Sequence, residues 1–334
     1  MEEQNSNQFL RRTTIIFNYL KKRKFRIAIF GFIYFLINFL DFKIDELYYS
    51  IKKINTDNEV VINLEDGNKI SVNLRDKGIA KELYLQKKRE IFSSEFLRNF
   101  INEDEVIIDI GANIGYYVII ESSILKNGKI YAIEPMPSNM ELLEYNVKLN
   151  NIENIELFQY AIGEENSSSK MYLYDRCNIS SFNKDLGREV LEEVDVEILT
   201  LDRFIELYME EYPSFIRMDI EGYEYHLFKG ATKLLKNGHS LKLKMEIHSF
   251  YLTKPQIDYI LDTLENNKFE IKAIILDPQN HNISSLKILN YLRENMGLPQ
   301  FGISPLNSYE TLKSILYTNC FIGNIAPIVF FERK

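Results

Sequence analysis

The stretch from residue 105 to 134 constrains the fold of this chain more than any other part of it. A short apolar run, 106–108, ends in Asp109, and a turn containing glycines, 111–115, leads directly into an apolar pattern with helical spacing. A second apolar run follows and ends in Glu134. This order of strand, glycine turn, helix and strand predicts a βαβ unit of a doubly wound α/β sheet, with a ligand-binding loop after the first strand.

The glycine turn indicates which kind of ligand the unit binds. Gly111 and Gly115 allow positive φ angles and close approach of the backbone, so main-chain N–H groups can face a bound molecule. Glu134 is placed to accept hydrogen bonds from both hydroxyls of a ribose. A dinucleotide site needs a glycine where this chain has Asn113, because a pyrophosphate must fit there. The loop therefore predicts a nucleoside without phosphates, and S-adenosylmethionine is the common one.

Several segments of the chain resemble the FkbM family of S-adenosylmethionine-dependent methyltransferases. They are DIGANIGYY (109–117), AIEPMPSNMELLEYNVKLNN (132–151), AIG (161–163), IRMDIEGYEYHLFKGA (216–231) and KMEIH (244–248). The upstream segment 77–97 also resembles the lead-in of some members, so the resemblance covers roughly residues 77 to 276. The chain departs from the family pattern at Arg217, where lysine is usual. Arginine keeps the charge but changes the hydrogen-bond geometry, so we do not give Arg217 the role of that lysine.

The resemblance implies a Rossmann-like class I methyltransferase fold, with a seven-stranded, mostly parallel, doubly wound sheet. It also implies that Tyr160 and Ala161 lie beside the adenine. Ser180 and Ser181 resemble a family element near the cofactor and the acceptor, although an ordinary solvated loop is the alternative. With the glycine turn, the expected cofactor-binding residues are Asp109, Gly111, Asn113, Gly115, Glu134, Tyr160 and Ala161.

Acidic residues mark a second part of the predicted site. Asp219 and Glu221 directly follow a predicted strand, and Glu246 and His248 end the next one. Because the carboxyl ends of parallel strands meet at one edge of a sheet, we expect these side chains to converge beside the glycine turn. All four are candidate catalytic residues, although acids after strands often cap helices and a lone histidine is usually structural.

The chemistry of methyl transfer defines what these residues must do. In-line attack on the sulfonium methyl gains mostly from alignment of the reactants within about 3 to 3.5 Å. An alcohol acceptor must also lose a proton, and His248 or Asp219 could take it as a general base. Glu221 and Glu246 would then hold sugar hydroxyls or orient the histidine. The clustered acids could instead bind Mg²⁺, although their spacing alone does not indicate a metal.

The composition excludes several classes of protein. With 46% hydrophobic residues in 334, the chain can bury a full core, so it is not a disordered protein. The net charge of -8 argues against binding to nucleic acid, which needs clustered positive charge. The cysteines, Cys177 and Cys320, are far apart in the sequence and predict neither a disulfide framework nor a zinc site. A cytoplasmic protein fits these features.

The N-terminal region contains the one basic cluster of the sequence. Basic residues within 21–26 precede an apolar run, 27–40, which is short for a membrane span of roughly twenty residues. A signal peptide is excluded because no small-residue cleavage site follows. A buried core helix fits the run, and so does a segment that contacts the cytosolic membrane face beside anionic lipid.

The sequence therefore divides into a basic and hydrophobic helical segment, 1–50, a lead-in, 51–100, and a methyltransferase domain, 101–334. Alternating residues on both sides of Asp66-Gly67 predict a β-hairpin in the lead-in, followed by one helix over 77–101. An insertion at about 277–321 has two helical patterns. Its position at the sheet edge is typical of segments that cover an active site.

From these observations we expect a methyltransferase that uses S-adenosylmethionine, most simply for O-methylation of a sugar hydroxyl on a glycan or glycolipid. A small metabolite or an amide nitrogen is the alternative acceptor. A nucleotide-dependent oxidoreductase and a catalytically silent binding module are alternatives from other classes. The glycine turn argues against the oxidoreductase, and a silent module need not keep Asp219, Glu246 and His248.

Overall fold

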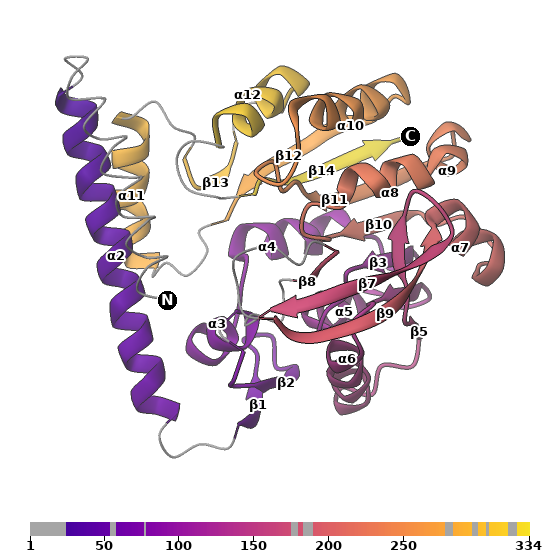
Figure 1. Cartoon of the computed structure of the whole chain (residues 1–334), viewed down its shortest axis with the longest axis horizontal. Coiled ribbons are helices and arrows are strands. Elements are labelled where there is room, and N and C mark those ends of the chain that lie inside the picture. The colour runs from indigo at the N-terminus through magenta and orange to yellow at the C-terminus, as the bar shows by residue number, and fades with distance from the viewer. Residues whose placement is uncertain are drawn as a thin grey trace. The chain divides into compact units, whose positions relative to one another are not determined.

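The computed structural model of the chain describes residues 25–53, 58–76, 78–174, 180–182, 190–277, 283–295, 300–304, 307–319 and 326–334. Both cysteines and the basic residues 21–24 lie outside this part of the chain. The chain forms two compact units, one made of Met1–Ile54 with Pro278–Gly302 and the other of Asn55–Asp277 with Ile303–Lys334 (Figure 1).

The first unit contains helices α2 (Phe25–Lys53) and α11 (Ile283–Asn295), which pack against each other. Phe30 and Tyr291 meet edge to face, with ring centroids 6.0 Å apart. Arg293 donates a hydrogen bond to the Tyr34 hydroxyl at 3.1 Å. Neither of these helices nor any other helix in the described ranges is long and apolar enough to cross a membrane.

The second unit is built on one large sheet with the strand order β13-β12-β14-β11-β10-β3-β4-β5. Its strands are β3 (Val106–Ile110), β4 (Lys129–Ile133), β5 (Ile155–Phe158), β10 (Phe215–Met218), β11 (Leu241–Glu246), β12 (Glu270–Leu276), β13 (Gly302–Ile303) and β14 (Ile328–Arg333). The strands from β5 to β11 are parallel, and β14 runs antiparallel between β11 and β12. The mostly parallel α/β fold is confirmed, and β13 from the insertion adds an eighth strand to the seven that we expected.

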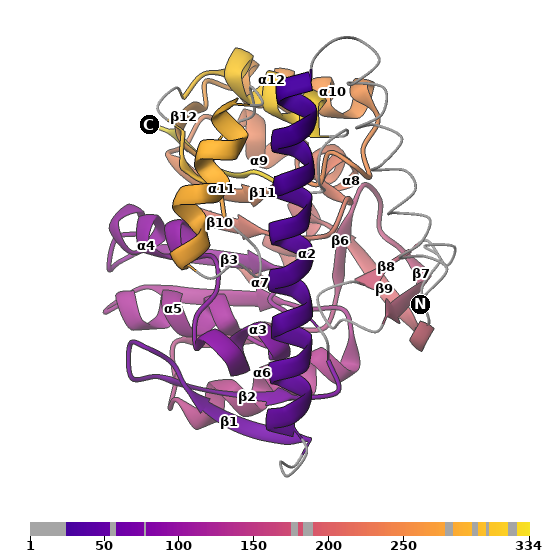
Figure 2. The ribbon, with the colours of Figure 1, turned by 90° about the vertical axis from the view of Figure 1, so that its left-hand side faces the viewer.

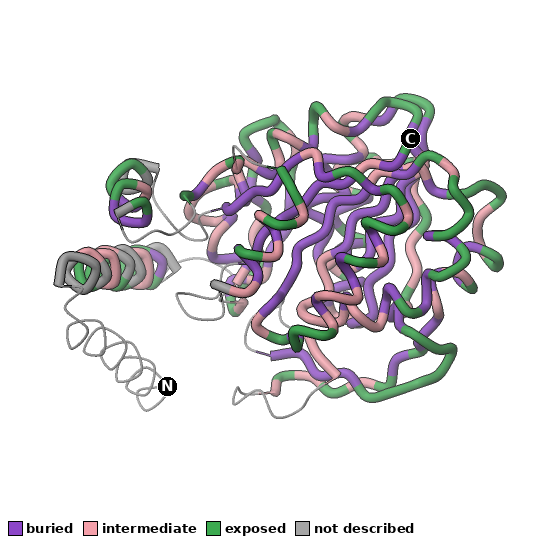
Figure 3. The backbone as a smooth tube through the Cα atoms, turned by 90° about the horizontal axis from the view of Figure 1, so that it is seen from above, coloured by how far each residue is buried: buried purple, intermediate pink, exposed green. Residues whose placement is uncertain are grey.

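Helices lie on both sides of this sheet (Figure 2). α4 and α5 pack together on one side, followed by α6, and α8 packs against α10 on the other. The central strands are buried from both sides, which explains their continuous apolar runs (Figure 3). The helices are α3 (Ile79–Gln86), α4 (Ile91–Phe100), α5 (Tyr116–Ile124), α6 (Pro137–Leu149), α7 (Leu201–Tyr208), α8 (Glu224–Gly230), α9 (Thr232–Lys236), α10 (Lys254–Asn266) and α12 (Tyr309–Asn319).

Two smaller sheets complete the unit. The predicted hairpin is confirmed as β1 (Glu59–Asn63) paired with β2 (Lys69–Asn73). A second sheet has the order β6-β9-β7-β8, and its strands are β6 (Ala161–Gly163), β7 (Ser167–Tyr174), β8 (Ser180–Ser181) and β9 (Val190–Thr200). The chain thus passes from the large sheet to this one between β5 and β6.

The lead-in after the hairpin differs from the prediction of one helix. The chain breaks between α3 and α4, where Lys87 and Glu90 have φ angles of 60° and 47°. These left-handed conformations cannot continue an α-helix. The break turns Arg89 and Glu90 into the interior, where they are 8% and 7% exposed.

Candidate active site

The glycine turn after β3 is held against the end of β4. Gly111 and Gly115 have φ angles of +78° and +90°, and Asn113 also has a positive φ of 52°. The N–H groups of Gly111 and Ala112 both donate to the carbonyl of Ile133, at 2.9 and 3.0 Å. A side chain at Gly115 would lie 2.7 Å from Leu143 Cδ1, so glycine is needed there for close packing on α6 as well.

Glu134 receives hydrogen bonds from three surrounding groups. Its Oε2 accepts from the N–H of Asn113 at 2.9 Å, and its Oε1 accepts from the N–H of Met136 at 3.0 Å and from Asn139 Nδ2 at 3.2 Å. Burial raises the pKa of Glu134 to about 7, although these hydrogen bonds oppose the shift. The carboxylate is therefore fixed in position, and both oxygens keep further acceptor capacity for ribose hydroxyls.

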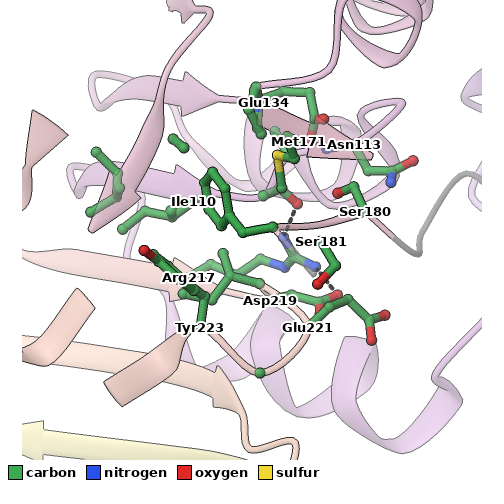
Figure 4. Close-up of a pocket in the computed structure, with 18 of the residues that line it drawn as sticks. Ile110, Asn113, Glu134, Met171, Ser180, Ser181, Arg217, Asp219, Glu221 and Tyr223 are labelled. Atoms are coloured by element: carbon green, nitrogen blue, oxygen red, sulfur yellow. Dashed lines mark hydrogen bonds and ion pairs between the residues drawn. The ribbon is translucent and has the colours of Figure 1, made fainter. Parts of the chain in front are cut away.

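A cavity of about 400 Å³ opens between this turn and the acidic turn after β10. Figure 4 shows Glu134 and Asn113 on one side of it and Asp219 and Glu221 on the other. Ser180 also contributes to the wall. The predicted residues that line the cavity are Gly111, Asn113, Glu134, Tyr160, Ala161, Ser180, Ser181, Asp219 and Glu221.

Four other predicted residues lie behind the wall, and Asp109 is the most deeply buried of them. Arg217 stands opposite Asp109 in the register of β10 and β3, and its Nη1 donates to Asp109 Oδ1 at 2.7 Å. Its Nη2 donates to Asp219 Oδ2 at 3.0 Å. Burial raises the pKa of Asp109, while Arg217 opposes the shift. Asp109 therefore supports the site through Arg217, and Gly115, Glu246 and His248 are the other residues behind the wall.

His248 lies among several carboxylates. Its Nδ1 is hydrogen-bonded to Glu224 Oε1 at 2.7 Å. Its Nε2 lies 3.5 Å from Glu221 Oε2, 3.7 Å from Glu246 Oε1 and 3.9 Å from Asp219 Oδ1. Burial alone would lower the pKa of His248, but the neighbouring carboxylates raise it well above its ordinary value. The expected convergence of these residues on one edge is therefore present in the structure.

Burial raises the pKa of two of the neighbouring carboxyl groups, because it disfavours their charged form. Burial, opposed by His248 and assisted by the charge of Asp219, raises the pKa of Glu221 to about 7. Burial also raises the pKa of Glu246 well above its ordinary value. At neutral pH this cluster holds fewer negative charges than its number of acids indicates.

Some residues of the site were not predicted from the sequence. Glu224 was assigned only to a helix, yet it is fully buried and binds His248. Arg89 lines the cavity, and its Nη2 lies 2.7 Å from Glu90 Oε1. An arginine followed by glutamate inside a helical pattern carries no signal of this arrangement. Tyr251 also lines the cavity and packs against Gly222, where a side chain would lie 2.5 Å from Tyr251 Cβ.

Comparison with known proteins gives a family match and several relatives. The model of the methyltransferase FkbM domain matches residues 109–271. Methyltransferase 1 of Beauveria bassiana is 24% identical over 170 residues, which cover 46% of this chain and 66% of that protein. Accumulates dyads protein 3 of Saccharomyces cerevisiae is 27% identical over 172 residues, which cover 49% of this chain and 21% of that protein.

Among solved structures, the crystal structure of Trm5b from Pyrococcus abyssi is similar to this chain at 12% sequence identity with a TM-score of 0.42. The match covers 84% of this chain and 56% of Trm5b. This chain therefore spans only part of the length of each of these three proteins.

Proposed function

We propose, from the premise that residues 109–271 are a domain of the FkbM methyltransferase family, that this chain transfers a methyl group from S-adenosylmethionine to a sugar hydroxyl. The observation that carries the proposal is the cavity between Glu134 and the acidic turn after β10. Its two sides offer different chemistry, one for a nucleoside and the other for a polar acceptor.

The side of the cavity formed by the glycine turn suits the adenosyl group. Glu134 accepts from backbone and amide donors and is held where ribose hydroxyls can reach it. Tyr160 and Ala161 line the same cavity and would lie beside the adenine. Asn113 stands at the position where a dinucleotide-binding turn needs its second glycine, which favours a nucleoside over a dinucleotide.

The opposite side of the cavity suits an acceptor with several hydroxyl groups. Asp219 and Glu221 are hydrogen-bond acceptors, while Arg89 and Gln256 supply donors in the lining of the same cavity. A sugar can satisfy such a mixed set of groups, whereas an apolar acceptor would leave them unpaired. The hydroxyl that is methylated would be the one whose oxygen lies in line with the bond from sulfur to the methyl carbon.

In the reaction, the methyl carbon exchanges its bond to sulfur for a bond to the acceptor oxygen. The acceptor oxygen attacks the methyl carbon, the bond from that carbon to sulfur breaks, and S-adenosylhomocysteine leaves as a neutral thioether. The proton of the hydroxyl passes to a carboxylate of the acidic turn and then to water. Asp219 is the better placed acceptor of that proton, because Arg217 fixes its other oxygen at 3.0 Å.

We also propose that helix α2 contacts the cytosolic membrane face, where a lipid-linked sugar would be found. Apolar residues on this helix are exposed, among them Phe32, Leu36, Leu40, Ile44 and Leu47. Their spacing of about four residues is that of one helix face, and basic residues precede the helix in the sequence. Sedimentation with vesicles of anionic lipid should bring down the full chain, and Leu40→Glu with Ile44→Glu should leave it in the supernatant.

The cofactor assignment is tested by calorimetric titration with S-adenosylhomocysteine, beside NADH. We expect a Kd on the order of micromolar for S-adenosylhomocysteine and no binding of NADH. Glu134→Ala should abolish binding, whereas Glu144→Gln, an exposed glutamate on α6, should not change it. Preference for NADH, or equal binding by both variants, would contradict the proposal. Methyl transfer to lipid-linked and free sugars would then be measured with labelled S-adenosylmethionine.

A further inference from the structure

Asp219 and Glu221, which line the acceptor side of the cavity, also form a cluster with His248. Ligand atoms of Asp219, Glu221 and His248 all lie within 4.8 Å of one another. The distances from His248 Nε2 to the two carboxylate oxygens are 3.9 and 3.5 Å, which are too long for strong hydrogen bonds. The three groups thus face a common point, and His248 Nε2 lies at ion-pair distance from both carboxylates.

Glu246 gives an independent indication that a positively charged ligand belongs at this point. Glu246 is 5% exposed and is a third carboxyl group beside the imidazole of His248. Its Oε1 points at the cluster, 3.7 Å from His248 Nε2. Three carboxyl groups thus surround one imidazole in a largely buried setting, where a bound cation would compensate their negative charge.

The orientation of His248 is the one found in metal sites. Its Nδ1 is fixed by Glu224 Oε1 at 2.7 Å, and Glu224 is fully buried. A histidine that binds a metal usually has its other nitrogen held by a carboxylate in this way. Asp219 is oriented similarly, because Oδ2 is bonded to Arg217 and Oδ1 faces the imidazole.

We propose that Asp219, Glu221 and His248 bind a divalent transition-metal ion, with Glu246 as a fourth ligand. Two ligand atoms in an octahedral shell of radius about 2.1 Å are roughly 3 Å apart, so the side chains need to move by less than about 1 Å each. Carboxylates with one imidazole suit Mn²⁺ better than Mg²⁺, which prefers oxygen ligands alone.

The role of the ion rests on the proposed function. An ion at this point would lie beside the acceptor side of the cavity, because Asp219 and Glu221 line that side. It would bind the hydroxyl oxygen of the sugar, lower the pKa of the hydroxyl and help to align it with the methyl group. The binding of the ion can be measured without any methyl donor, so the two proposals can fail separately.

The full chain is treated with EDTA and then titrated with Mn²⁺. The EPR signal of free Mn²⁺ measures how much of the ion is bound. We expect stoichiometric binding by the wild type and at least about tenfold weaker binding by Glu221→Gln and His248→Ala. His226→Ala is the matched control, because His226 Nδ1 pairs with the single carboxylate of Glu164 at 3.1 Å. It should bind Mn²⁺ like the wild type.

Folding of each variant is checked by circular dichroism. Because His248 is buried, Glu221→Gln keeps the test valid if His248→Ala does not fold. Absence of saturable binding by the wild type, or unchanged binding by a folded Glu221→Gln, would overturn the proposal. S-adenosylhomocysteine is titrated into the same samples. If the wild type binds S-adenosylhomocysteine but not Mn²⁺, only the metal proposal is overturned. If it binds Mn²⁺ but not S-adenosylhomocysteine, only the cofactor assignment is overturned.

Discussion

Gly111 lies directly against the backbone carbonyl oxygen of Asp219, so that a Cβ atom on this glycine would overlap that oxygen. The contact joins the glycine turn after β3 to the acidic turn after β10. It therefore fixes the distance between the two sides of the cavity. Both turns follow neighbouring parallel strands, which explains why they meet.

Replacing this glycine should be severe. We expect Gly111→Ala to lower the free energy of unfolding by at least about 3 kcal/mol, because a positive φ and a backbone overlap are added together. Gly67→Ala is the control, since Gly67 also has a positive φ but has no atom within 4 Å of an added Cβ. It should lose about 1 to 2 kcal/mol. Urea unfolding measures both, and equal losses would show that the contact is unimportant.

The hydrogen bonds from Arg217 to Asp109 and Asp219 should contribute strongly to the stability of the folded chain. Arg217→Met would leave Asp109, which is 0% exposed, without its cation. We expect a loss of about 3 to 5 kcal/mol in the free energy of unfolding. Asp109→Asn with Arg217→Met should lose less than the sum of the single variants, because the charge of Asp109 is removed together with its partner. Additive losses in urea unfolding would contradict a direct pairing.

Glu134 should make stability depend on pH in a defined direction. Its pKa is raised from 4.5 to about 7, so between these values the unfolded chain loses a proton that the folded chain keeps. The folded state is thus destabilised as pH rises through this window, and the effect is complete above about pH 7.

The test compares unfolding of the wild type and Glu134→Gln at about pH 5 and pH 8. The variant cannot titrate, so its stability relative to the wild type should increase by roughly 2 to 3 kcal/mol at the higher pH. Glu144→Gln, at an exposed position, should show no such increase. A difference that does not change with pH would mean that Glu134 is already ionised at pH 5.

Asn146 should hold the hairpin to the domain. Its Oδ1 accepts from the N–H of Ser71 at 2.6 Å, and its Nδ2 donates to the carbonyls of Ser71 and Ile114 at 3.1 and 2.8 Å. Asn146→Ala would leave these buried backbone groups unpaired, and we expect a loss of about 2 to 4 kcal/mol. Asn150→Ala, at a more exposed pair with Lys69, should lose about 1 kcal/mol or less.

Hydrogen exchange gives a second measurement of this attachment. The amide of Ser71 should exchange faster in Asn146→Ala, and faster exchange in Asn150→Ala alone would contradict the assignment.

The central part of the fold and much of the candidate site could be predicted because their signals are local. The run from Asp109 to Glu134 shows a strand, a turn and a helix in adjacent residues. The meeting of Asp219 with the glycine turn then follows from the geometry of a parallel sheet, without any knowledge of side-chain contacts. The position of His248 near Asp219 follows in the same way.

Other features depend on contacts between residues far apart in the sequence. Ser138 and Glu141 have the spacing of a capping box, yet the helix begins at Pro137 after Met136. The Ser138 hydroxyl instead donates to Glu192, on β9. The break at Glu90 is likewise set by its buried contacts with Arg89 and Tyr117, since no glycine or proline marks the break. A local pattern does not contain these partners.

The cavity has a wall that comes from outside the matched FkbM domain. Ile79 and Arg89 line it, although the family model begins at residue 109. A recombinant fragment trimmed to the matched residues would therefore lack two of the residues that line this cavity, even if it folded. For the same reason, two relatives that share every motif of the domain can differ in acceptor through α3 and the turn that follows it. A comparison of acceptor preference between such proteins should therefore include the sequence of the lead-in.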